Sequence, residues 1–209
     1  MSMRTEAEEH LRVIRSLMER ATIYRAISAP AALIAGILAC VAGFVFAGQG
    51  FPLVPWDYAF QAKWLLVLLI ASIVNFWFLA RDAKRRGDPF VSASMRLALR
   101  AMLPPLLCGA VFTWVFPGSA VVPFWLISYG LALLATAHFA PASLTRLGWP
   151  FLLSGFAVLL VSVHIFEALA PLAPWDDYTM AAAFGVFHVI YAACAWPRKS
   201  TEAEPAAVL

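Results

Sequence analysis

The sequence predicts an all-α polytopic membrane protein, a six-transmembrane-helix bundle with an N-terminal cytoplasmic amphipathic helix. Three observations lead to this prediction. Apolar residues make up 63% of the 209 residues, charged residues make up only 13%, and the charges fall in short blocks between long apolar stretches. A soluble domain carries about 25% charged residues, so this chain has too little polar surface for water. We therefore expect lipid as its solvent.

Six apolar stretches approach the roughly 20 residues that a helix needs to cross the hydrocarbon core. They cover residues 26–47, 62–80, 101–116, 121–138, 148–169 and 179–196. The third stretch is the shortest, and its start is open, because Pro104 and Pro105 lie either in its first turns or deeper in the helix. Pro117 and Gly118 predict a tight turn, so the third and fourth helices should be antiparallel.

The distribution of charge predicts the orientation. Cytoplasmic loops of membrane proteins carry the excess of Lys and Arg. With the N-terminus inside, six spans place 14 of the 15 basic residues in cytoplasmic segments, and only Lys63 falls outside. The outer loops instead hold Asp57, Asp176 and Asp177. Tryptophans, which favour membrane interfaces, fall near the helix ends. Both termini are therefore predicted to be cytoplasmic.

The chain divides into three regions. Residues 1–25 are predicted to form an amphipathic helix, because Leu11, Ile14 and Met18 recur at helical spacing. This helix either docks on protein or lies on the inner leaflet. Residues 26–197 form the six-helix transmembrane domain, and residues 198–209 are predicted to be a disordered cytoplasmic tail.

Few residues in the apolar stretches could carry chemistry. No Asp, Lys or Arg lies in the central part of any stretch, which argues against an ion-coupled transporter or a proton pump. The sequence contains no nucleophile elbow, phosphate-binding loop or paired-carboxylate site. We therefore expect a protein that is not an enzyme and that binds no nucleic acid.

His188 is the first candidate for a binding residue. It lies near mid-depth in the sixth stretch, with Tyr191 three residues further on. An imidazole at this depth can hydrogen-bond a neighbouring helix, bind haem or a metal, or move a proton, and the hydrogen bond is the expected role. Other polar residues in the stretches could line a small-molecule pocket or join helices by hydrogen bonds: Ser72, Asn75, Ser128 and Tyr129.

His164 and Glu167 are the candidate metal ligands. They lie one turn apart near the outer end of the fifth stretch and share a helix face. Together with Asp176 and Asp177 they could hold a divalent ion through nitrogen and oxygen ligands, although a solvated helix end has the same composition. A haem shared by His164 and His188 is disfavoured, because their depths differ by roughly 7 Å at the helical rise.

Four segments, IRSLMER, LPPLLCGAVFTW, WLISYG and GVFHVIYA, resemble segments of small bacterial membrane proteins of similar length. That resemblance implies a bacterial cytoplasmic membrane and implies no activity. The leading hypothesis is a non-enzymatic sensor or accessory protein that acts through a membrane or cytoplasmic protein partner or a second copy of itself. The alternatives are a small-molecule or haem site around His188 and a metal site at His164 and Glu167. A cavity in the bundle would favour the small-molecule site, and a solid core would favour the partner.

Overall fold

The computed structural model describes residues 9–10, 27–49, 54–87, 91, 93–138, 140–169 and 175–196. Every regular element in these ranges is helical and none is a strand, which confirms the predicted all-α class. Four of the helices are long and apolar enough to cross a membrane, as expected of a membrane helical bundle. Apart from residues 9–10, the predicted N-terminal helix lies outside the described residues, as does the tail at 198–209.

The helices match the six apolar stretches of the sequence. The elements are α2 (Ala29–Cys40), η1 (Val41–Val45), α3 (Trp56–Arg86), α4 (Ala93–Val115), η2 (Gly118–Val121), α5 (Val122–Leu134), α6 (Ala142–Leu169), α7 (Trp175–Met180), η3 (Ala181–Val186) and α8 (Phe187–Ala195). The segments η1 and η3 are π-helical. α2 continues into η1, and α7, η3 and α8 follow one another without a break.

The third helix is longer than its apolar stretch, because α4 begins at Ala93 rather than near residue 101. Its first turns are amphipathic: Met95 and Ala98 are buried, while Arg96 is exposed. Because basic residues interrupt the apolar pattern in these turns, a search for apolar residues alone does not detect the start of the helix. Pro104 and Pro105 therefore lie in the helix interior, where each removes a backbone hydrogen bond.

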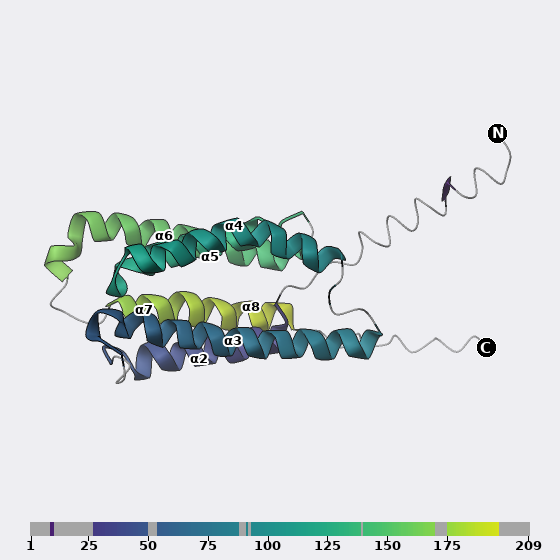
Figure 1. Cartoon of the computed structure of the whole chain (residues 1–209), viewed down its shortest axis with the longest axis horizontal. Helices are drawn as coiled ribbons and strands as arrows, with labels where there is room; N and C mark the ends of the chain where they lie inside the picture. The colour runs from purple at the N-terminus through teal and green to yellow at the C-terminus, as the bar shows by residue number, and fades with distance from the viewer. Residues whose placement is uncertain are drawn as a thin grey trace, which may run out of the picture.

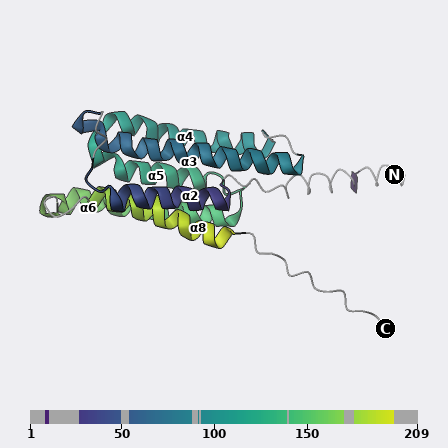
Figure 2. The same cartoon turned by 90° about the horizontal axis from the view of Figure 1, so that it is seen from below.

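The helices form two layers (Figure 1). One layer contains α4, α5 and α6, and the other contains α2, α3 and the continuous helix of α7, η3 and α8. The layers meet where α6 contacts α8 and where η2 contacts α3. Figure 2 shows α3 and α4 at the same edge of the bundle, yet these two helices do not pack against each other along their length.

Within each layer, glycines let helices approach closely. A Cβ atom at Gly43 would lie 2.5 Å from the backbone oxygen of Asp177 and 2.6 Å from the Cβ of Ala181. In the other layer, a Cβ at Gly130 would lie 2.6 Å from the backbone nitrogen of Leu152. Such distances are too short for any side chain, so the helices of each layer are in backbone contact.

The exposed basic residues gather at one end of the bundle. They lie at the end of α3, in the first turns of α4 and early in α6. These residues are Arg81, Lys84, Arg85, Arg96, Arg100 and Arg146. Lys63 lies near the start of α3, toward the opposite end (Figure 1).

Replacing Gly43 with alanine should destabilise the fold. The added methyl group would overlap the backbone of α7 and force η1 away from it, and overpacking of this kind costs about 1–3 kcal/mol. Unfolding of the purified protein in detergent, followed by circular dichroism, measures this change. Ile37→Ala, on the exposed face of α2, is the control. Equal stability of the two variants would show that the close approach at Gly43 does not exist.

Candidate functional site

A cavity of about 450 Å³ lies between the two layers. Side chains from α2, α3, α4, α5, α7, η3 and α8 line it, and most of them are apolar. The polar side chains in the lining are Ser72, Thr113, Ser128, Tyr129 and His188. No Asp, Glu, Lys or Arg of the described chain belongs to the lining. The cavity is therefore an apolar space with a few hydrogen-bonding groups and no permanent charge.

His188 joins the layers through a hydrogen bond to Tyr129. Its Nε2 atom lies 2.9 Å from the Tyr129 hydroxyl oxygen on α5, and its Nδ1 atom lies 3.0 Å from the backbone oxygen of Phe184. A carbonyl oxygen only accepts hydrogen bonds, so Nδ1 carries the proton and Nε2 accepts from the Tyr129 hydroxyl. Both ring nitrogens thus have partners, and the histidine makes the interhelical hydrogen bond that the sequence left as one of several roles.

Aromatic rings surround this pair. The Tyr129 ring lies 4.7 Å from the ring of Phe151 on α6 and 5.2 Å from the ring of Phe184, measured between centroids. Phe151 is fully buried and lies 5.5 Å from the His188 ring. Such distances are those of favourable aromatic pairs. The cluster of Tyr129, Phe151, Phe184 and His188 therefore connects the layers beside the cavity.

Tyr191 and Asn75, also singled out in the sequence, serve other contacts. The Tyr191 hydroxyl donates to the backbone oxygen of Ile27 at 3.2 Å, and Tyr191 does not line the cavity. The Asn75 side-chain oxygen accepts from the backbone N–H of Ser28 at 3.3 Å, at the start of α2. Both residues thus hold the beginning of α2, whereas Ser72, Ser128 and Tyr129 line the cavity.

Gln61 connects α3 to α4 near the cavity, and the sequence analysis did not identify it. Its side-chain nitrogen donates to the backbone oxygens of Thr113 at 3.1 Å and Phe116 at 2.8 Å. Its side-chain oxygen is buried and has no hydrogen-bond partner among the residues that the structure describes. Gln61 shares a helix face with Leu65, Leu68 and Ser72. A polar residue at helical spacing from these residues was the signal in the sequence that could have identified Gln61.

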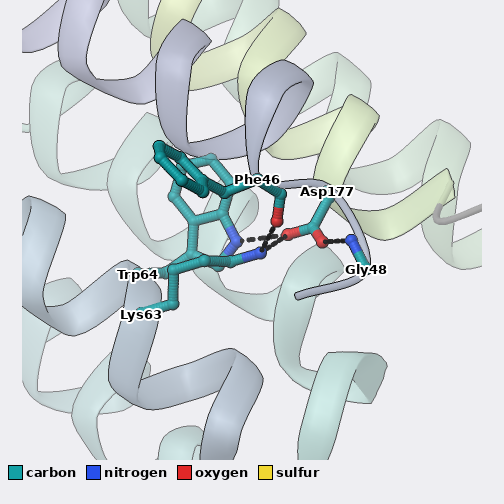
Figure 3. Close-up of polar contacts among 5 residues, drawn as sticks. All are labelled: Phe46, Gly48, Lys63, Trp64 and Asp177. Atoms are coloured by element: carbon teal, nitrogen blue, oxygen red, sulfur yellow. Dashed lines mark hydrogen bonds and ion pairs between the residues drawn. The ribbon is translucent and has the colours of Figure 1, made fainter. Parts of the chain in front are cut away.

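A buried ion pair lies near the start of α3 (Figure 3). Lys63 Nζ is 2.6 Å from Asp177 Oδ1, and the two side chains are only 11% and 5% exposed. The same carboxylate accepts from the indole N–H of Trp64 at 2.9 Å and from the backbone N–H of Gly48 at 2.8 Å. The lysine that the sequence analysis placed on the outer side is therefore paired with one of the aspartates that it placed there. The pair ties α7 to α3 and to the turn after η1.

The predicted metal ligands lie near the end of α6. The backbone of His164 and Glu167 is helical, but their side chains lie outside the described part of the structure. Among the described side chains, no group of three or more His, Cys, Asp or Glu could hold a metal. Asp177, which the sequence placed near this pair, is bound to Lys63. The metal site stays a prediction.

No family model, curated protein or solved structure matches this chain.

Tyr129→Phe should lower the stability of the bundle by about 1–2 kcal/mol. Interhelical hydrogen bonds in membranes contribute about 0.6 kcal/mol on average, but here the variant leaves Nε2 of His188 buried without a donor. Thermal unfolding in detergent measures the change. Tyr58→Phe, at an exposed tyrosine, is the matched control, and equal melting temperatures of the two variants would contradict the hydrogen bond.

Asp177→Asn should destabilise the protein by about 3 kcal/mol, because it leaves a buried lysine without a counter-charge. Asparagine has a single acceptor oxygen, so it can accept from Trp64 or from Gly48 but not from both, and the loss combines the missing charge with one missing hydrogen bond. The double variant Lys63→Met, Asp177→Asn should regain part of the stability, since no lone charge remains. Chemical unfolding in micelles measures all three proteins. A loss no greater than that of Asp82→Asn on α3 would refute the buried pair.

Proposed function

We propose that this chain is a bacterial inner-membrane protein that holds a small, uncharged, apolar molecule in the cavity between its layers and acts as a non-enzymatic sensor or accessory protein. The cavity carries this proposal. Its volume of about 450 Å³ falls within the range of about 300–1,000 Å³ that is typical of ligand pockets. An apolar lining with a few polar groups is also typical of such pockets. Action through a protein partner or a second copy of the chain is part of the proposal and rests on the sequence.

The orientation is part of the same proposal. Exposed arginines and lysines lie at the end of the bundle where α2 begins and α8 ends (Figure 1). An excess of basic residues is the mark of the cytoplasmic side. We therefore place both chain termini in the cytoplasm, with six helices crossing the membrane. The pairing of Lys63 with Asp177 supports this orientation, because the one basic side chain on the outer side is neutralised.

A haem in the same cavity is a weaker candidate. His188 would need a free ring nitrogen to bind iron, and its Nε2 atom accepts from Tyr129 while Nδ1 donates to the Phe184 carbonyl. Ligation would therefore first break the hydrogen bond that joins the layers. An absorption spectrum of the purified protein tests this candidate, and a Soret band lost in His188→Ala would replace our proposal with it.

Filling the cavity should displace the bound molecule. Ala71 lines the cavity from α3, whereas Ala80 lies on the same helix, is exposed and does not belong to the lining. We expect solvent to extract an uncharged molecule from the purified wild-type protein and from the Ala80→Phe variant. The extracted amount should be at least about tenfold lower in Ala71→Phe, because a loss of about 1.4 kcal/mol in binding free energy corresponds to that factor. Mass spectrometry of the extracts measures the molecule per protein chain.

Two results would contradict the proposal. One is an extract that contains no molecule in stoichiometric amount with the wild-type protein. The other is an equal amount in Ala71→Phe and Ala80→Phe, which would mean that the molecule coats the outer surface. Circular dichroism of both variants establishes that they are folded before the extracts are compared.

A further inference from the structure

The cavity reaches the surface between α3 and α4. It is only partly enclosed, and three leucines of its lining are also exposed: Leu65 by 42%, Leu68 by 54% and Leu106 by 42%. These residues lie along the middle of α3 and α4, away from the basic end of the bundle. The surface around them is apolar, since the neighbouring Leu69 and Leu107 are exposed as well. The mouth of the cavity therefore faces the hydrocarbon of the membrane.

Gln61 fixes one limit of this mouth. Its two hydrogen bonds to the backbone oxygens of Thr113 and Phe116 hold α3 against the last turn of α4. Leu65, Leu68 and Ser72 follow Gln61 along the same face of α3 and line the cavity. The two helices are thus joined at this end, while the lining residues beyond it face an opening.

Ser128 places an unpaired hydroxyl group in the cavity wall. It lines the cavity and is only 4% exposed. Serine and threonine inside helices commonly bond back to a carbonyl of the preceding turn, as Thr113 does to Gly109 and Ser162 does to Val158. Ser128 makes no such bond within the described chain, and its hydroxyl is not one of the fully enclosed atoms that lack a partner, so it is open to the cavity. A hydroxyl that faces an apolar cavity without a partner is costly, so a bound molecule that paired with it would gain affinity.

The remaining polar groups define what the molecule can be. The Tyr129 hydroxyl gives its proton to His188, and the Thr113 hydroxyl both donates to Gly109 and accepts from Trp125 at 2.9 Å. Ser72 also lines the cavity, but it is less buried than Ser128, which is 4% exposed. Ser128 is therefore the hydroxyl best placed to donate to a ligand inside the cavity. A charged group would find no counter-charge in the lining and would be strongly disfavoured in this apolar space.

We infer that the cavity takes an uncharged lipid, with one apolar chain and a hydroxyl or carbonyl group, which enters from the bilayer between α3 and α4 and is held by a hydrogen bond to Ser128. This inference rests on the proposed function, because it requires that the cavity binds a molecule. It adds the chemical class of that molecule, the route by which it enters, and the residue that selects its polar group.

The test uses a long-chain alcohol with a diazirine in its chain as the probe, added to the full chain in lipid nanodiscs and activated by light. We expect labelled peptides from the cavity lining of α3, α4 and α5. Ser128→Ala should reduce this labelling about fivefold, the factor for one net hydrogen bond, and should leave labelling by a diazirine alkane without the hydroxyl unchanged. Ser162→Ala, whose hydroxyl bonds to its own helix, is the matched control and should label as wild type.

A second pair of variants tests the route. Leu106→Trp narrows the mouth and should slow labelling by the alcohol several-fold. Leu107→Trp adds the same ring one residue away, at an exposed position outside the lining, and should not. Equal labelling rates for the two variants would contradict entry from the bilayer between α3 and α4.

The outcomes separate this inference from the function it rests on. If a molecule is extracted from wild type and lost in Ala71→Phe, but Ser128→Ala labels like wild type, the cavity binds a ligand and the assignment of Ser128 is wrong. Equally strong labelling by an ionised diazirine fatty acid would overturn the uncharged class. Labelling spread over all exposed helix faces and unchanged in Ala71→Phe would mean general contact with lipid, and would overturn both the inference and the proposed function.

Discussion

The hydrogen bond between the Tyr129 hydroxyl and His188 Nε2 joins the two helical layers beside the cavity. In an apolar environment an imidazole nitrogen without a partner is costly, so each residue holds the other in place. The 2.9 Å bond fixes the tautomer of the histidine, and the bond of Nδ1 to the Phe184 carbonyl fixes the ring relative to its own helix. Because Tyr129 and His188 also line the cavity, the same contact sets the shape of one wall.

Close packing within the layers and loose packing between them explain why a cavity exists at all. Gly36 and Gly43 bring α2 and η1 against the backbone of the helix formed by α7, η3 and α8, and glycines on α5 and α6 do the same in the other layer. The buried pair of Lys63 and Asp177 adds a polar connection inside the first layer. The layers meet through the aromatic cluster, through Gln61 and where η2 contacts α3, and the cavity lies between them, lined by the middle turns of α3 and α4.

Much of the fold could be predicted from the sequence, because membrane helices are marked by local composition. The six stretches correspond to observed helices, but α3, α4 and α6 begin before their stretches, at Trp56, Ala93 and Ala142. Charged and polar residues interrupt the apolar pattern there, as Arg96 and Arg100 do in α4. The partners of the polar residues could not be predicted, because they come from distant parts of the chain. The sequence identified His188 as a candidate, but its hydrogen bond to Tyr129 joins residues that are 59 positions apart. The pairing of Lys63 with Asp177 likewise depends on how α7 lies beside α3. The cavity depends on the spacing of α3 and α4, which no local pattern encodes.

The most direct test of the cavity and of the contact between the layers is an experimental structure of the full chain in a lipid bilayer, at a resolution that shows side chains. The account predicts α3 and α4 apart along their middle turns, Tyr129 within hydrogen-bonding distance of His188, and density for an elongated molecule that ends near Ser128. A bundle in which α3 packs against α4 and apolar side chains fill the space between the layers would contradict it.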